Sequence, residues 1–170
     1  MQCQRDTCCV WLMGIITGSN PVLTTNRNVN YNMEKKYFLT NEEFTKFLEE
    51  IGGVKNGFSS KEEIIKEKDF FSVSNGWLGL IKEMMEDIIS MGWNKEVCQV
   101  KEKFGGLRFY INNASNEVHD RITQTENLSY QICEICGESG KLRTDIGWYL
   151  TLCDEHYNLN KKRIYEKQNN

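Results

Sequence analysis

Two pairs of potential metal ligands constrain this chain more than any other feature of its sequence. They stand in the stretch "QICEICGESGKLRTDIGWYLTLCDEHY", residues 131–157, as Cys133 with Cys136 and Cys153 with His156. The first pair has the Cys-x2-Cys-Gly spacing of a tight knuckle, in which two thiolates face one ion and the glycine accepts an unusual backbone angle. The second pair would project from one face of a helix that begins there, because residues three apart share a side of the first turn.

The order of these parts predicts a treble-clef-like module at about residues 131–166. A knuckle comes first, the segment "KLRTDIGWYLTL" can form a short hairpin, and the second ligand pair then opens a helix whose N-terminus favours a thiolate at Cys153. Four N and S ligands select Zn²⁺ and close its coordination sphere, so we expect one structural Zn²⁺ rather than a catalytic one. The alternative is that these are ordinary buried cysteines.

The chain has 170 residues, seven cysteines and a net charge of -3. An odd number of cysteines with one tight ligand cluster is typical of a reduced, cytoplasmic protein and not of a disulfide framework. The apolar run "CCVWLMGII" is too short to span a membrane. The small negative charge argues against a protein that covers nucleic acid through bulk positive charge, although a local basic patch is compatible with it.

The first 32 residues differ from the rest of the chain. After the apolar run, "TGSNPVLTTNRNVNYN" has the composition of a linker, and Met33 opens "MEKKYFLTNEEF", which resembles an ordinary cytosolic start. A signal-peptide core is the alternative, but one Arg offset by one Asp precedes the run and no clear cleavage site follows it. We therefore expect residues 1–32 to be a poorly structured extension and residues 33–170 to form a single α+β domain.

Helices are expected first in that domain. Thr40 and Glu43 form a capping box before an apolar helical pattern that Gly52-Gly53 ends. A second short helix is predicted to start at Ser60. In "GWLGLIKEMMEDIISMGW" the apolar side chains fall on one stripe, which indicates a core helix ending at Gly92. The stripe consists of Leu78, Ile81, Met84, Met85, Ile88 and Met91.

A β-hairpin is predicted in "KEVCQVKEKFGGLRFYINN", where two alternating runs meet at Gly105-Gly106. Lys101 and Lys103 would lie across the strands from Arg108, with aromatic residues close by. Basic and aromatic side chains therefore interleave here, and Lys101, Lys103 and Arg108 are our tentative partner-contact residues. A solvated strand face backed by an aromatic core face is the plainer interpretation, and a nucleic-acid-binding face is a further alternative. A helix over about 116–129 then leads to the ligand pairs.

Four stretches resemble a family of small bacteriophage and prophage proteins: "GW" before the amphipathic helix, "VKEKFGGLRFYI", "ENLSYQICEICGESG" and "GWYLTLCDEH". The resemblance covers roughly residues 76–157 and leaves out the N-terminal third. It implies a zinc-binding role for Cys133, Cys136, Cys153 and His156, and an origin in a phage or mobile element. It carries no expectation of a particular activity.

We expect no catalysis. Treble clefs also occur in HNH-type nucleases, but this chain has two histidines, and His119 in "NEVHDRI" lacks a partner at catalytic spacing. Neither "GWLGL" nor "FGGL" has the Lys-Ser/Thr pair of a phosphate-binding loop. Cys98 lies in a strand pattern with no histidine near it.

Two hypotheses follow for the function. The first is a non-enzymatic zinc-binding phage or mobile-element accessory protein that binds and modulates a protein or protein–nucleic acid complex, a class that includes counter-defence inhibitors of the anti-CRISPR kind. The alternative is a nucleic-acid-binding accessory protein, in which the zinc module, the basic hairpin and the charged run Lys161 to Arg163 contact phosphates. An HNH-like nuclease is the least favoured class, and neither a membrane partner nor a small-molecule substrate is expected.

Overall fold

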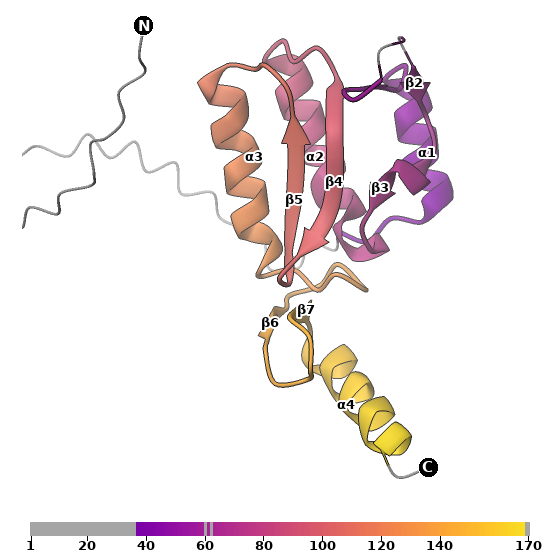
Figure 1. Ribbon diagram of the computed structural model, residues 1–170, viewed down its shortest axis with the longest axis vertical. Helices are drawn as coiled ribbons and strands as arrows, with labels where there is room; N and C mark the ends of the chain where they lie inside the picture. Colours follow the sequence, from indigo (N-terminus) through magenta and orange to yellow (C-terminus); the bar gives the residue numbers. More distant parts are fainter. Residues whose placement is uncertain (1–36, 60, 62, 169–170) are drawn as a thin grey trace, which may run out of the picture. The chain divides into compact units, whose positions relative to one another are not determined.

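The fold is α+β, as the sequence predicts. A computed structural model describes residues 37–59, 61 and 63–168. Its helices are α1 (Asn41–Glu50), α2 (Leu78–Ser90), α3 (Asn116–Ser129) and α4 (Asp154–Gln168), and two short 3-10 turns, η1 (Lys68–Phe70) and η2 (Asn75–Trp77), lie between α1 and α2 (Figure 1). The extension expected over residues 1–32 lies outside the described residues.

A mixed five-stranded sheet is organised around one long strand (Figure 1). On one side of this strand, β4, two short strands pair with it in parallel: β1 near its beginning and β3 further along. On the other side β5 pairs with β4 in antiparallel fashion, and β2 pairs with β1. The strands are β1 (Val54–Asn56), β2 (Ile64–Ile65), β3 (Phe71–Ser72), β4 (Glu96–Lys103) and β5 (Gly106–Ile111).

The predicted β4–β5 hairpin is confirmed, with Lys101 opposite Arg108. Its two-residue turn is Phe104-Gly105, both at positive φ (53° and 75°), the conformation that two-residue hairpin turns favour. Gly106 already belongs to β5. A register shift between Val97 and Gln99 changes the face that the strand presents, so Val97 is buried although simple alternation groups it with the exposed Gln99.

The helical predictions at Thr40 and at "GWLGLIKEMMEDIISMGW" are also confirmed. Thr40 and Glu43 form the expected reciprocal cap, with bonds of 3.1 and 2.8 Å, at the start of α1. On α2 the apolar stripe is buried, whereas Met91 lies beyond the last turn and is 44% exposed, so it is not part of the core. The stripe packs with buried side chains of α1, α3 and the sheet in one core, which includes Phe44, Leu48, Val100, Phe109 and Ile122.

The short helix predicted at Ser60 is wrong. Ile64 and Ile65 instead form β2, in register with Lys55 and Val54 of β1. Two consecutive β-branched residues, one exposed and one buried, suit an edge strand better than a helix, and a helix of this length has too few turns to repay its nucleation. Among the described residues, no helix combines the length and apolar character needed to cross a membrane.

Candidate metal centre

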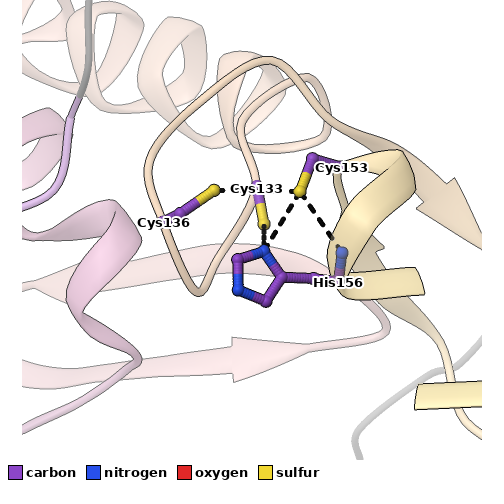
Figure 2. A group of neighbouring side chains, drawn as sticks. All are labelled: Cys133, Cys136, Cys153 and His156. Atoms are coloured by element: carbon purple, nitrogen blue, oxygen red, sulfur yellow. Dashed lines mark hydrogen bonds between the residues drawn. The ribbon is translucent and has the colours of Figure 1, made fainter. Parts of the chain in front are cut away.

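The four predicted ligands lie together at one point of the C-terminal module. Cys133 and Cys136 come from the loop after α3, Cys153 directly precedes α4, and His156 lies in the first turn of α4 (Figure 2). Between the pairs, β6 (Lys141–Arg143) and β7 (Leu150–Leu152) form the expected short hairpin. The four ligand atoms all lie within 4.8 Å of one another, so the group is positioned to hold one metal ion.

Two of the separations between ligand atoms match those expected around a tetrahedral ion. Bonds of about 2.3 Å to sulfur and about 2.0–2.1 Å to nitrogen place neighbouring ligand atoms about 3.5–3.8 Å apart. Cys136 Sγ lies 3.8 Å from Cys153 Sγ, and Cys133 Sγ lies 3.7 Å from His156 Nδ1. The third close pair, Cys153 Sγ and His156 Nδ1, is tighter at 3.1 Å, and the imidazole presents Nδ1 to the sulfurs (Figure 2).

Local backbone geometry sets the first pair in place. Within the knuckle, Gly137 N donates to Cys133 O at 2.9 Å and Cys133 N donates to Glu138 O at 2.7 Å. Gly137 has φ +74°, so the glycine fulfils the conformational role that its position after Cys136 predicts. The knuckle is therefore a turn that backbone hydrogen bonds close.

The second pair is held by the helix start. The backbone N–H of His156 points at Cys153 Sγ, with an N to S distance of 3.5 Å. The sulfur thus sits where a side-chain acceptor caps a helix, and the positive end of the helix dipole favours its thiolate form. The expectation that both side chains project from the first turn of a helix is confirmed for His156, whereas Cys153 is the residue directly before that turn.

The crowding of sulfur atoms has a consequence for protonation. Burial, together with the adjacent Cys133 and Cys153 side chains, raises the pKa of the Cys136 thiol to about 12. A divalent cation reverses this preference because it stabilises the thiolates that it binds. Three sulfurs and one imidazole nitrogen are a donor set of structural zinc sites, so the residues present fit a zinc ion.

The knuckle is fastened to segments far away in the sequence. Tyr37 N donates to Gly137 O at 2.9 Å, and Gly76 N donates to Glu134 O at the same distance. A Cβ on Gly76 would lie 2.6 Å from the Glu134 carbonyl carbon, so the backbones approach too closely for a side chain. The metal centre is therefore positioned by the α+β core as well as by its own hairpin.

The β4–β5 turn is fastened to the β6–β7 hairpin. Thr151 Oγ1 donates a buried hydrogen bond of 2.6 Å to Gly105 O, and Glu134 N donates to Thr151 O at 3.0 Å. A Cβ on Gly105 would clash with the Leu142 side chain. The first glycine of the pair in "KEKFGGLRFY", Gly105, thus serves a contact between the sheet and the metal module.

The tentative partner-contact residues differ in how far their side chains are engaged in contacts within the fold. Lys103 is exposed, with Nζ 5.6 Å from the centre of the Phe104 ring, and Lys101 Nζ lies at the same distance from the Tyr110 ring. Arg108 is instead committed within the fold, because its guanidinium donates to Tyr130 Oη at 2.8 Å and to the Leu107 carbonyl at 2.6 Å. His119 is exposed on α3 and Cys98 is buried in β4.

Two features lie outside the sequence predictions. One is an exposed aromatic patch formed by Phe104, Trp148 and Tyr149, which are 57%, 65% and 46% exposed and border a hollow of about 330 Å³. The pair of aromatics after Gly147 is the signal that could have indicated it. The other is Glu134, which is 8% exposed. Burial and the charge of Glu102 raise the pKa of Glu134 to about 7, and no sequence signal marks that burial.

Comparison of the chain with protein-family models, curated proteins and solved structures finds no match. The resemblance to phage and prophage proteins therefore rests on the quoted stretches. Of what that resemblance implies, the structure supports the cluster of Cys133, Cys136, Cys153 and His156 as a metal-binding group.

Proposed function

We propose that the four clustered side chains hold one Zn²⁺ in a structural role. The chemistry of the donor set and the separations of the ligand atoms support this assignment. All four positions of a tetrahedral ion are taken by protein ligands, so water and substrate have none. Bound zinc would clamp the knuckle to the start of α4, and with it the β6–β7 hairpin that carries Trp148 and Tyr149.

We further propose that the chain is a non-enzymatic module that binds a macromolecular partner through the aromatic patch. The observation that carries this proposal is the gathering of Phe104, Trp148 and Tyr149 from two segments distant in sequence, with the Phe104 and Tyr149 rings 6.1 Å apart. Large exposed aromatic side chains are uncommon on surfaces that contact only water, and Trp and Tyr dominate binding energy at protein interfaces. A hollow bordered by such rings can accommodate a side chain of the partner and shield it from water.

A protein partner is the class that we favour. Lys103 beside Phe104 and Lys101 on the same strand give the patch a basic border, which suits an acidic surface on the partner. The sequence resemblance alone supports the finer proposal of a phage or mobile-element accessory protein with a counter-defence role. In that case the partner would be a host protein or protein–nucleic acid complex.

A nucleic-acid partner is the second candidate. Lysines lying over aromatic rings, as Lys101 lies over Tyr110 and Lys103 over Phe104, resemble the alternation of rings and cations in grooves that bind single strands. Binding of this kind would weaken steeply with salt because counterions are released from phosphates.

Substitution of the patch tests the proposal. Trp148→Ala should abolish capture of the partner from a lysate of the host cell, whereas Phe58→Ala, which removes a 77% exposed ring from another loop, should leave capture unchanged. Lys101→Glu with Lys103→Glu should weaken binding while zinc content and stability stay the same, since exposed charges contribute about 0–1 kcal/mol each. Equal capture by all variants would refute the patch as the contact surface. Retardation of single-stranded DNA or RNA at physiological salt, lost in Trp148→Ala, would establish the nucleic-acid alternative instead.

A further inference from the structure

A second concave site lies beside the metal module, where the sheet meets the knuckle. It is a pocket of about 460 Å³, which we call the Glu134 pocket. Its apolar lining includes the half-buried Leu150, with the fully buried Phe71 and Trp77 beneath the surface, and its acidic side chains are Asp69, Glu102 and Glu134. Neither the metal centre nor the aromatic patch uses this pocket.

Glu134 is the feature of the pocket that calls for a ligand. Its side chain is 8% exposed, and its Oε2 atom is buried without a hydrogen-bond partner among the described residues. Burying a carboxylate without a partner costs several kcal/mol, roughly, and native structures rarely keep such a group without a use for it. Both backbone groups of Glu134 are hydrogen-bonded, to Thr151 and Gly76, so the backbone that carries this side chain is fixed in place.

A second carboxylate adds to the negative charge. Glu102 lines the same pocket, and its Oε1 accepts a hydrogen bond of 2.5 Å from the backbone N–H of Gly105. Among the described residues that line the pocket, Lys68 is the single cation. Its Nζ donates a hydrogen bond of 2.8 Å to the carbonyl oxygen of Val73. The lining therefore carries three acidic groups against one basic group.

The shape and chemistry of the pocket select the kind of cation. Apolar walls around a buried carboxylate suit a long alkyl stem that ends in a charged head. A guanidinium is more weakly hydrated than an ammonium, so it loses less hydration free energy on entering such a site. It can also donate two parallel hydrogen bonds to one carboxylate. A bare divalent ion is a poorer match. Among the described residues, the group of three or more side chains placed to hold a metal ion is the Cys133 cluster, and the acidic side chains of this pocket do not form such a group.

We propose that the Glu134 pocket binds an arginine side chain presented by the protein partner. The inference deepens the proposed function and rests on it for the nature of the partner. The pocket and the aromatic patch are lined by neighbouring residues of the same two segments, Glu102 with Phe104 and Leu150 with Tyr149. A protein seated on the patch is thus well placed to insert an arginine beside it.

A small probe tests the pocket independently of the partner. Nα-acetyl-L-arginine amide is titrated into the ¹⁵N-labelled, zinc-loaded full chain at physiological salt, to about 50 mM, which suffices for a contact of this size. We expect saturable shifts of the Trp77 indole signal and of amides around Glu134. The citrulline analogue, which is neutral and of similar shape, should give no saturable shift.

Matched variants make the result decisive. Glu134→Gln should weaken binding of the probe at least tenfold, Glu102→Gln should weaken it by a smaller factor, and Glu49→Gln, on the exposed face of α1, should change nothing. Glu134→Gln should also keep or raise the melting temperature, because the neutral amide removes a buried unpaired charge. Should it fail to fold, Glu102→Gln alone serves for the comparison.

Three outcomes would show that the pocket does not recognise a guanidinium through its acidic side chains. They are no saturable shift with the arginine probe, equal binding by citrulline, and undiminished binding by every folded acidic-to-amide variant. Tighter binding of free L-arginine than of the blocked amide would assign the pocket to a free amino acid and not to a partner's side chain. Since the probe does not involve Trp148, loss of the patch proposal and loss of the pocket proposal remain separate results.

Discussion

The indole Nε1 of Trp77 donates a buried hydrogen bond of 2.8 Å to the carbonyl oxygen of Ile132. The two residues are 55 positions apart, and Ile132 directly precedes the first metal ligand. Trp77 is fully buried at the entry to α2, so this bond joins the start of a core helix to the segment that leads from α3 into the knuckle. Core and metal module therefore share a contact that neither could supply alone.

Trp77→Phe should lower the free energy of unfolding by about 2–4 kcal/mol, because it leaves a buried carbonyl without its donor and removes part of a packed ring. Urea unfolding of the zinc-loaded protein measures the loss. Trp93→Phe is the matched control, since the Nε1 of Trp93 is buried with no hydrogen-bond partner among the described residues. Its loss should be smaller, about 0–2 kcal/mol, and equal losses would show that the Trp77 bond contributes nothing.

Gly137→Ala should be more damaging than Gly147→Ala. Both glycines have positive φ, +74° and +81°, so either alanine is strained by about 1–2 kcal/mol. At Gly147 nothing lies within 4 Å of the added carbon, whereas at Gly137 it would lie 2.6 Å from the carbonyl carbon of Tyr37. We expect a total cost of about 3 kcal/mol or more at Gly137, read from thermal or urea unfolding. Similar costs at both sites would mean that the backbone at Tyr37 shifts to accommodate the added carbon with little loss of stability.

One Zn²⁺ per chain is expected after purification without chelators. Cys136→Ser should bring the zinc content near zero and unfold the C-terminal third, because an empty site contributes nothing to offset chain ordering. Cys98→Ser is the control: this residue is outside the cluster, and a serine can keep the bond of 3.0 Å to Asn112, so zinc should stay and stability fall by only about 1 kcal/mol. Metal analysis showing much less than one zinc in the parent would contradict the assignment.

What the sequence predicts well in this chain is what depends on near neighbours. The cap at Thr40 and the ligand spacings at Cys133 and Cys153 involve residues three apart, so their geometry follows from the local backbone alone. The helix expected at Ser60 failed because Ile64 and Ile65 pair with β1, a contact that no local pattern encodes.

The surfaces proposed for binding could not be predicted for the same reason. Glu134 is adjacent to a metal ligand in a polar-looking stretch, and its burial follows from the docking of the knuckle on Gly76 and Thr151. The aromatic patch likewise depends on Thr151 meeting Gly105, which brings Tyr149 next to Phe104. Arg108, one of the tentative contact residues, lies within reach of Tyr130 because α3 packs on β5, and no local pattern indicates that bond.

A chain that begins at Met33 should keep the melting temperature and zinc content of the full chain. Residues 1–32 supply no periodic apolar face in the sequence, while Tyr37, which is buried and bonded to Gly137, is retained. Thermal unfolding followed by circular dichroism compares the two chains. A large drop in melting temperature on truncation would show that "CVWLMGII" contributes to the stability of the fold.

The shortened chain also isolates the four cysteines of the domain, since Cys3, Cys8 and Cys9 are removed from the seven. Burial first, and the charge of Glu96 second, raise the pKa of the Cys98 thiol above its ordinary value. A raised pKa means a smaller thiolate fraction at any given pH below it, and the thiolate is the form that alkylates. The thiol of an exposed cysteine has a pKa of about 8.5. The rate of Cys98 alkylation should therefore rise only at a higher pH than the rate for an exposed cysteine.

Iodoacetamide labelling followed by mass spectrometry between pH 7 and 10 gives this profile residue by residue. In the zinc-loaded chain all four cysteines should react slowly near neutral pH, the three ligands because zinc holds their sulfurs and Cys98 because it stays protonated and buried. Removal of zinc should release Cys133, Cys136 and Cys153 but leave Cys98 slow for as long as the sheet is folded. In urea, where the sheet is unfolded, the alkylation rate of Cys98 should rise at the same pH as that of an exposed cysteine. Rapid reaction of Cys98 in the native, zinc-loaded chain would show that β4 is open to solvent at that point.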